Sequence, residues 1–228
     1  MKKPIITTAL KGLFLKSDPW EKAHIIWYED REKEINKKKL DNSAIKEWRA
    51  LLESDPEKEN KEYFKYVDKI MSVLYPKLTE KERTKKAREL FFESTIKYIR
   101  QNPNTINKKV INYFKSLKKK YRLALITTNT LQALNSILKI SKLENLFDII
   151  EASLPKEKDD KKAVFDRFIE KNGKPVLYIG NSKDALLYSK EKRINTLYAN
   201  LENKEEIKGI ESINSLKGLE EKIEKFQK

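Results

Sequence analysis

The spacing of apolar residues changes twice along this chain. The run PIITTAL at residues 4–10 is apolar and rich in β-branched residues, which predicts a short buried strand that ends at Lys11-Gly12. From Pro19 to about Asn102 the apolar residues instead recur every three or four positions, which predicts amphipathic helices. Beyond Asn104 the strand-like pattern returns and alternates with helix-like segments.

The middle stretch holds four sets of apolar residues at helical spacing. Polar or proline-containing breaks at 41–43, 54–56 and 75–76 separate them and supply helix caps and stops. We therefore expect an inserted unit of about four helices held together by aromatic faces. The sets are Trp20, Ala23, Ile26 and Trp27; Ile45, Trp48, Leu51 and Leu52; Tyr63, Phe64, Val67, Ile70, Met71 and Leu74; and Leu90, Phe91, Thr95, Tyr98 and Ile99.

Strands and helices alternate in the remaining sequence. The strands are expected at residues 122–128, 147–153, 175–180 and 194–199, with a weaker one at 210–213 and a closing helix from Leu216 to Phe226. Such alternation predicts a parallel sheet with right-handed crossovers. The predicted fold class is α/β: a Rossmann-like three-layer core formed by residues 1–18 and 104–228, with a helical domain inserted at 19–103.

Composition narrows the classes of function. The 228 residues suffice for one core and a smaller unit. Without cysteine there are no disulfides, thiolate zinc sites or cysteine nucleophiles. The single histidine, His24, lies in a helical pattern and no nucleophile-elbow motif accompanies it, so we interpret it as a packing or surface residue. No apolar run is long enough to span a membrane and the N-terminus is too polar for a signal peptide, which predicts a cytoplasmic protein without a membrane partner.

The formal charge of +15 comes from 50 basic and 35 acidic residues. Such an excess raises the hypothesis of nucleic-acid binding. However, the basic residues are mostly lysines mixed with glutamate, whereas arginine, which gives bidentate phosphate contacts, is scarce. We therefore favour a solvated lysine-rich surface and keep nucleic-acid binding as the weaker interpretation.

Polar residues follow three of the expected strands. They occupy Ala9–Gly12, Thr127–Thr130 and Gly180–Asp184. Ligands of open parallel sheets bind beyond the carboxyl ends of the strands, so these segments are candidates for one site. In the second segment a threonine hydroxyl precedes the amides of a helix start, an arrangement that suits phosphate. The competing interpretation is ordinary N-capping of the helix that begins near Leu131.

These features resemble the haloacid dehalogenase (HAD) superfamily, in the subgroup with a helical cap inserted after the first strand. The resemblance covers nearly the whole chain and rests on Gly12, the helical insert, LALITTN at 123–129, FDIIEAS, the lysine-rich stretch before VFDRFI, and LYIGNSKDAL at 177–186. It implies a phosphohydrolase that uses an aspartate nucleophile, a second aspartate as acid/base, and Mg²⁺.

The chain departs from that pattern at the positions of the nucleophile, the acid/base and the metal-binding aspartate. Counting back from Gly12 places Ala9 at the nucleophile and Lys11 at the second aspartate. Alanine cannot attack phosphorus, and a cationic lysine does not readily replace a carboxyl acid/base. Asn181 stands where the resemblance implies a metal-binding aspartate, and Asp184, the remaining nearby acid, sits one residue early. Asp18 is a poor substitute nucleophile, because it lies well beyond the strand tip.

Phosphate-binding positions are better preserved. Thr128 matches the implied phosphate-binding hydroxyl, with Asn129 beside it. The implied phosphate-binding lysine is Lys158, Lys161 or Lys162; we favour Lys162, although each is equally explained as a solvated helix residue. The ammonium group of Lys11 stands where the resemblance implies a carboxylate that would bind a cation. We therefore hypothesise that Lys11 occupies the place of Mg²⁺ and faces Asp184 or a bound anion.

Three interpretations follow. The first is a HAD-like protein that has lost hydrolysis, needs no cofactor, and binds a phosphorylated ligand or a protein partner. The second is an active, divergent Mg²⁺-dependent phosphatase that acts on a small phosphorylated metabolite. The third is a nucleic-acid-binding module that uses the lysine-rich surface.

Overall fold

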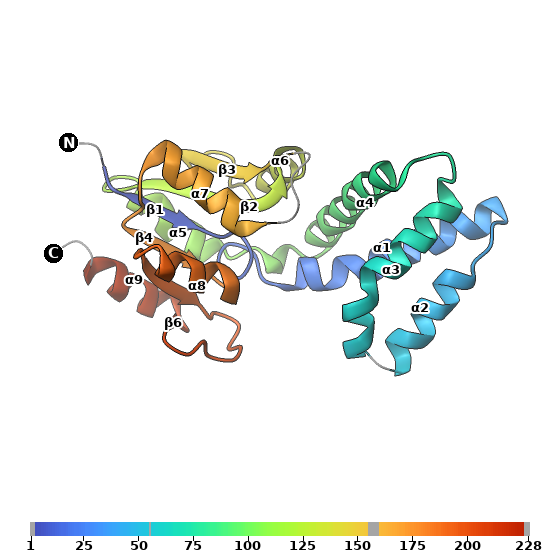
Figure 1. Cartoon of the computed structure of the whole chain (residues 1–228). Helices are drawn as coiled ribbons and strands as arrows, with labels where there is room; N and C mark the ends of the chain where they lie inside the picture. The colour runs from blue at the N-terminus through green and yellow to red at the C-terminus, as the bar shows by residue number, and fades with distance from the viewer. Residues whose placement is uncertain (1–2, 55, 155–159, 226–228) are drawn as a thin grey trace. The chain divides into compact units, whose positions relative to one another are not determined.

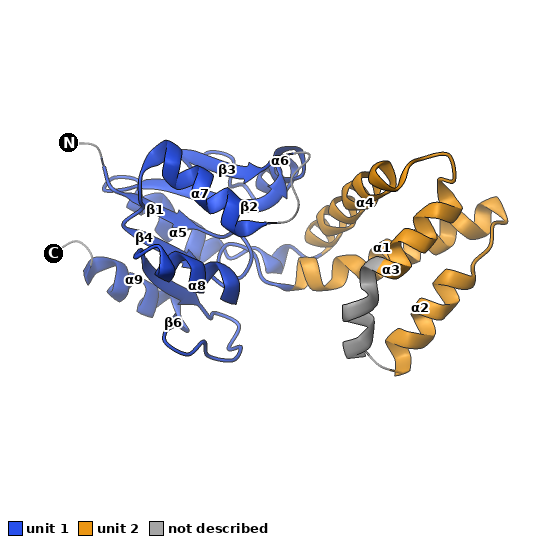
Figure 2. Cartoon of the chain, viewed as in Figure 1, with its two compact units in different colours: residues 1–17, 102–228 blue, residues 18–101 orange. Residues whose placement is uncertain are grey.

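The chain divides into two compact units in a computed structural model that describes residues 3–54, 56–154 and 160–225, with side chains left out for 56–64. One unit, the core, comprises residues 1–17 and 102–228; the other, the helical unit, comprises residues 18–101 (Figure 2). None of the described helices is long and apolar enough to cross a membrane.

The core is built on a six-stranded sheet in the order β3-β2-β1-β4-β5-β6 (Figure 1). Every neighbouring pair is parallel. This confirms the predicted α/β fold class, including the weak last strand. The strands are β1 (Ile5–Thr8), β2 (Arg122–Thr130), β3 (Ile149–Ser153), β4 (Leu177–Gly180), β5 (Asn195–Ala199) and β6 (Glu211–Ile213).

Helices cover both faces of this sheet. The buried side chains of α7 and α8 pack on one face, and α5 lies on the other (Figure 1). The short helix η1 (Pro103–Thr105) precedes α5. The core helices are α5 (Lys108–Leu117), α6 (Leu131–Ile140), α7 (Lys161–Asn172), α8 (Lys183–Glu191) and α9 (Leu216–Lys225).

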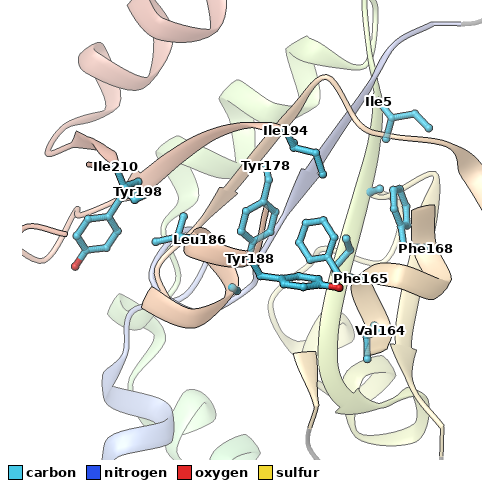
Figure 3. Close-up of a cluster of buried hydrophobic side chains, with 13 residues drawn as sticks. Ile5, Val164, Phe165, Phe168, Tyr178, Leu186, Tyr188, Ile194, Tyr198 and Ile210 are labelled. Atoms are coloured by element: carbon cyan, nitrogen blue, oxygen red, sulfur yellow. The ribbon is translucent and has the colours of Figure 1, made fainter. Parts of the chain in front are cut away.

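Aromatic side chains fill the layer between the sheet and α7 and α8. Phe165 meets Tyr178 edge to face, with ring centroids 5.0 Å apart, and contacts Tyr188 in the same way at 6.2 Å (Figure 3). Tyr178 is fully buried, which raises the pKa of its phenol. Its hydroxyl has no hydrogen-bond partner among the described residues. This layer is therefore tightly packed around one unpaired polar atom.

The helical unit contains α1 (Asp18–Lys38), α2 (Ser43–Ser54), α3 (Pro56–Leu74) and α4 (Glu80–Gln101). Its centre is aromatic: Trp27 is fully buried, and the rings of Tyr28 and Trp48 stack with centroids 3.6 Å apart. The four predicted helices are present, and His24 lies half-buried on α1. The side chains of Tyr63 and Phe64, which the sequence also assigns to this packing, lie outside the described residues.

Hydrogen bonds join the two segments of the core at which the chain enters and leaves the helical unit. Lys16 donates its backbone N–H to Thr105 at 2.9 Å, and Asn107 donates to Phe14 at 2.8 Å. Both the N–H and the hydroxyl of Ser17, the last residue before α1, donate to the carboxylate of Glu202. Hydrogen bonds thus hold both ends of the insertion within the core.

Candidate functional site

The strand order brings the three polar strand ends together. β1 lies between β2 and β4, and all three run in the same direction, so their carboxyl ends share one edge of the sheet. Ala9 continues the contact beyond β1, because its N–H donates to the carbonyl of Ile179 at 2.9 Å. We call this side of the core the carboxyl edge.

The chain turns sharply after β1. The carbonyl of Leu10 accepts hydrogen bonds from the N–H groups of Phe14 and Leu15, both at 3.2 Å. Gly12 adopts a φ of 79°, in the left-handed region that favours glycine. A Cβ atom at this position would lie only 2.3 Å from Nδ2 of Asn181. The amide of Asn181 therefore packs directly on the turn, so Gly12 is required both by its backbone conformation and by its neighbour.

The side chains at this turn offer little to a metal ion. Ala9 is buried and has only a methyl group, and Lys11 is half-buried and carries an ammonium group. Asp184 is exposed in the first turn of α8. Across the described residues, no group of three or more histidine, aspartate or glutamate side chains is arranged to hold a metal. A hard cation such as Mg²⁺ prefers carboxylate oxygens, so these residues do not fit it.

The end of β2 departs from regular strand geometry. β2 pairs with β3 at Thr127 and again at Thr130, but the register shifts between them, leaving Thr128 and Asn129 as a bulge. Bulges re-aim side chains and are frequent beside functional sites. The hydroxyl of Thr127 accepts a hydrogen bond from the N–H of Asn129 at 3.1 Å, which braces the bulge.

Helix α6 begins directly after this bulge. Its N-cap residue, Thr130, makes no side-chain capping hydrogen bond. The competing interpretation, ordinary N-capping, is therefore not realised by this threonine. The first N–H groups of a helix carry partial positive charge and suit an anion. The end of β2 and the start of α6 therefore present polar groups of a kind that suits an anion.

The two described candidate lysines point in different directions. The ammonium of Lys161 donates to the carbonyl of Ile126 in β2. The ammonium of Lys162 instead lies 5.4 Å from the centre of the Tyr188 ring. Asp160 caps α7 and accepts a 2.8 Å hydrogen bond from the N–H of Lys162, which sets the start of the helix.

Consecutive residues of a helix project about 100° apart, so only one of these two side chains reaches the sheet. Lys161 reaches β2, whereas Lys162, the residue preferred from the sequence, contacts Tyr188; Lys158 lies outside the described residues. Sequence reasoning also missed the support that Thr127 gives to Asn129. The available signal in the sequence was a threonine two residues before an asparagine at a strand end, a spacing at which the hydroxyl can bond the asparagine N–H.

A pocket of about 570 Å³ opens beside Asn181. Its wall combines apolar groups, ammonium groups and the carboxylates of Glu205 and Glu206, and it belongs entirely to the core. Small-molecule sites are commonly concave and of this volume. The residues that characterise it are Lys183, Leu187, Tyr198, Lys204, Ile207 and Lys208.

Residues 35–199 match the family model described as Haloacid dehalogenase-like hydrolase. The chain belongs to this family. The matched HAD segment spans most of the chain and begins within α1, so β1 and its turn lie outside it. No curated protein matches the chain.

Solved HAD structures share the fold at low sequence identity. The 2-haloacid dehalogenase of Pseudomonas syringae pv. Tomato DC3000 is 17% identical, with a TM-score of 0.61 over 99% of this chain and 100% of the other. β-Phosphoglucomutase of Clostridium difficile is 16% identical, with a TM-score of 0.59 over 100% and 99%. The HAD hydrolase YfnB of Bacillus subtilis, crystallised with magnesium, is 14% identical, with a TM-score of 0.59 over 98% and 100%.

Proposed function

We propose that the carboxyl edge binds a phosphorylated small molecule and does not hydrolyse it. One observation supports the proposal: the edge has groups that suit an anion, while other groups stand at the positions where the resemblance implies carboxylates. The bulge at Thr128, the start of α6 and Lys161 all serve an anion. A methyl, an ammonium and an amide stand at Ala9, Lys11 and Asn181.

Hydrolysis by the HAD route requires a carboxylate that attacks phosphorus and forms an acyl-phosphate. The buried methyl group of Ala9 has no lone pair to offer. Asn181 cannot take over the role, because an amide is a poor nucleophile and its side chain packs against Gly12. A phosphate group held at this edge would therefore stay intact.

Positive charge from the protein replaces that of a metal ion in this proposal. Lys11 lies in the turn after β1 and Lys161 reaches β2, the neighbouring strand. Hydrogen bonds from an ammonium to phosphate are charge-assisted and do not require a divalent ion. The pocket beside Asn181 has room for the remainder of a small phosphorylated molecule. Phosphate affinity should therefore be independent of Mg²⁺.

Two neighbouring lysines give a matched test. We expect calorimetry with inorganic phosphate to detect binding whose Kd changes less than about twofold when Mg²⁺ is added. Lys161→Met should weaken this binding about tenfold or more, because a hydrogen bond to a charged group contributes on the order of 1.5–3 kcal/mol. Lys162→Met should stay within about twofold, because that ammonium lies over Tyr188.

The competing interpretation is an active, divergent phosphatase. It predicts Mg²⁺-dependent turnover of p-nitrophenyl phosphate that is abolished by Thr128→Ala or Asp184→Ala. We expect no such turnover from the wild-type chain. Turnover lost in both variants would overturn the proposal, and equal weakening of phosphate binding by the Lys161 and Lys162 substitutions would overturn the assignment of Lys161.

A further inference from the structure

The positive charge of this protein is distributed unevenly. The helical unit, residues 18–101, has 20 basic and 18 acidic residues and is close to neutral. The core therefore carries thirteen of the fifteen excess charges. Lysine and glutamate are therefore balanced in the helical unit but not in the core.

More than half of the excess lies in the segments that lead into the first five strands of the core. These segments hold twelve basic and four acidic side chains. They comprise 3–4, 118–122, 139–148, 170–176 and 190–194, and we call them the amino edge. Because the sheet is entirely parallel, they all lie on the side opposite the carboxyl edge.

Hydrogen bonds tie neighbouring segments of the amino edge together. The ammonium of Lys3 donates to the carbonyl of Lys118 at 2.8 Å, and that of Lys118 donates to the carbonyl of Asn145 at 2.9 Å. These contacts join the entries of β1, β2 and β3. In Figure 1 this is the side from which the chain enters β1. Three of the five basic segments are thus directly connected.

Helix capping alone does not explain this surface. Helices α5, α6, α7 and α8 end at the amino edge, and each C-terminus carries a partial charge of roughly −0.5, about −2 in total. Within the edge, Asp148 pairs with Lys118 at 3.0 Å. The edge itself has a formal excess of eight, with that aspartate already counted. Two carboxylates from outside these segments offset further charge, because Glu151 pairs with Lys171 at 3.2 Å and Asp166 pairs with Lys192 at 2.8 Å. A surplus of roughly four positive charges remains.

The side chains of the amino edge suit a phosphate backbone better than bases or lipid. Its aromatic residues, Tyr121 and Phe147, are both buried, so they form no stacking platform for single strands. Val176 is the sole exposed large hydrophobic residue recorded among its described positions, which gives little to insert into a membrane. Lysine ammonium groups act as point charges for phosphates.

The dimensions of the edge agree with a duplex. The segments lead into five adjacent strands, β3-β2-β1-β4-β5, which span about 19 Å at roughly 4.8 Å per strand. Double-stranded DNA carries one charge per roughly 1.7 Å of axis, so about eleven phosphates fall within that span. About half of these phosphates lie on the side of the duplex that faces the protein. Their number is comparable to the surplus of positive charges on the amino edge.

We infer that the amino edge is a sequence-independent binding surface for duplex nucleic acid. It lies at the opposite end of the strands from the candidate phosphate site, and the inference does not depend on that site. Backbone contacts of this kind position a protein on a duplex without reading its sequence. Binding should therefore be weak, strongly salt-dependent and indifferent to base composition.

Two triple charge reversals of the full chain provide the test. Lys119, Lys142 and Lys174 are exposed on the entries of three different strands, and Lys37, Lys77 and Lys85 are exposed in the helical unit. Fluorescence anisotropy with a 20-base-pair DNA duplex should give a Kd of roughly 10⁻⁶–10⁻⁴ M for the wild type. K119E/K142E/K174E should weaken it at least tenfold and reduce the salt slope by about 2–3, at about 0.9 per lost contact. K37E/K77E/K85E should change it less than threefold.

Three outcomes would overturn the inference. Equal weakening by both triple variants would show a general effect of net charge. A wild-type chain that binds vesicles with 30% anionic lipid but not the duplex would assign the surface to membranes. A folded K119E/K142E/K174E variant that binds the duplex with the wild-type Kd would show that the amino edge is not the binding surface. K119Q/K142Q/K174Q, which adds no acidic groups, repeats the measurement if the reversal variant does not fold, and is expected to weaken binding at least threefold.

Discussion

Alanine at position 180 is expected to lower the free energy of unfolding by about 2–3 kcal/mol, the upper range for overpacking a core. The added Cβ would lie 2.5 Å from the hydroxyl oxygen of Tyr178 and 2.8 Å from its ring carbon Cζ. The ring cannot easily withdraw, because it is fully buried against Phe165. Urea denaturation of the wild-type and G180A chains measures the loss.

Two further variants isolate the cause. Tyr178→Phe removes a buried hydroxyl that has no partner among the described residues, and should raise stability by about 1 kcal/mol. It also relieves the closest contact, so Gly180→Ala should cost less in the Y178F background. Gly218→Ala is the matched control: it lies in α9 with ordinary spacing and should stabilise by up to about 1 kcal/mol. Additive effects of the substitutions at 178 and 180 would contradict this explanation.

Replacing Arg167 with methionine is expected to lower the free energy of unfolding by about 3 kcal/mol. Its Nε atom lies 2.6 Å from Glu151, and its Nη2 donates to the carbonyl of Ala152 at 2.7 Å. Glu151 is only 7% exposed, so removing the guanidinium leaves a buried carboxylate with incomplete compensation. Breaking a buried ion pair typically costs about 3–5 kcal/mol. Chemical denaturation again provides the measurement.

The second partner of Glu151 is the control for this prediction. The Lys171 ammonium lies 3.2 Å from the same carboxylate, but its side chain is 56% exposed and remains largely solvated. Lys171→Met should therefore cost no more than about 1 kcal/mol. The double variant Glu151→Leu/Arg167→Met should recover most of the loss, because no buried charge remains. If Arg167→Met lowers the free energy of unfolding no more than Lys171→Met does, the explanation by a buried, uncompensated Glu151 is refuted.

The fold was predictable because its signal is local. The segment from Arg122 to Thr130 is largely apolar where it is buried, and α5 places Val110, Ile111 and Phe114 on one face. Alternation of such segments leaves few topologies other than a parallel sheet. Element boundaries moved by one to three residues; for example, β1 ends at Thr8, whereas the apolar run continues to Leu10.

The candidate site was predictable only in part. Thr128 and Asn129 could be named because a polar pair ends an apolar strand, but the bulge that contains them depends on the register with β3. The choice between Lys161 and Lys162 as the phosphate-binding lysine stays a prediction, and sequence alone could not tell that Lys161 contacts β2, because neighbouring lysines are equivalent until the start of α7 and the position of β2 are known. The contact between Gly12 and Asn181 joins residues far apart in sequence, and no periodicity predicts it.

The sequence by itself determined the family resemblance, the parallel α/β core and the identity of Ala9, Lys11 and Asn181, the residues at positions where the resemblance implies carboxylates. Side-chain chemistry of that kind is a property of each residue and needs no coordinates. Only the tertiary structure decided which lysine reaches the sheet, and only it gathered twelve basic residues on one edge. Those residues come from five separate segments, which become neighbours because parallel strands align their entry points on one side.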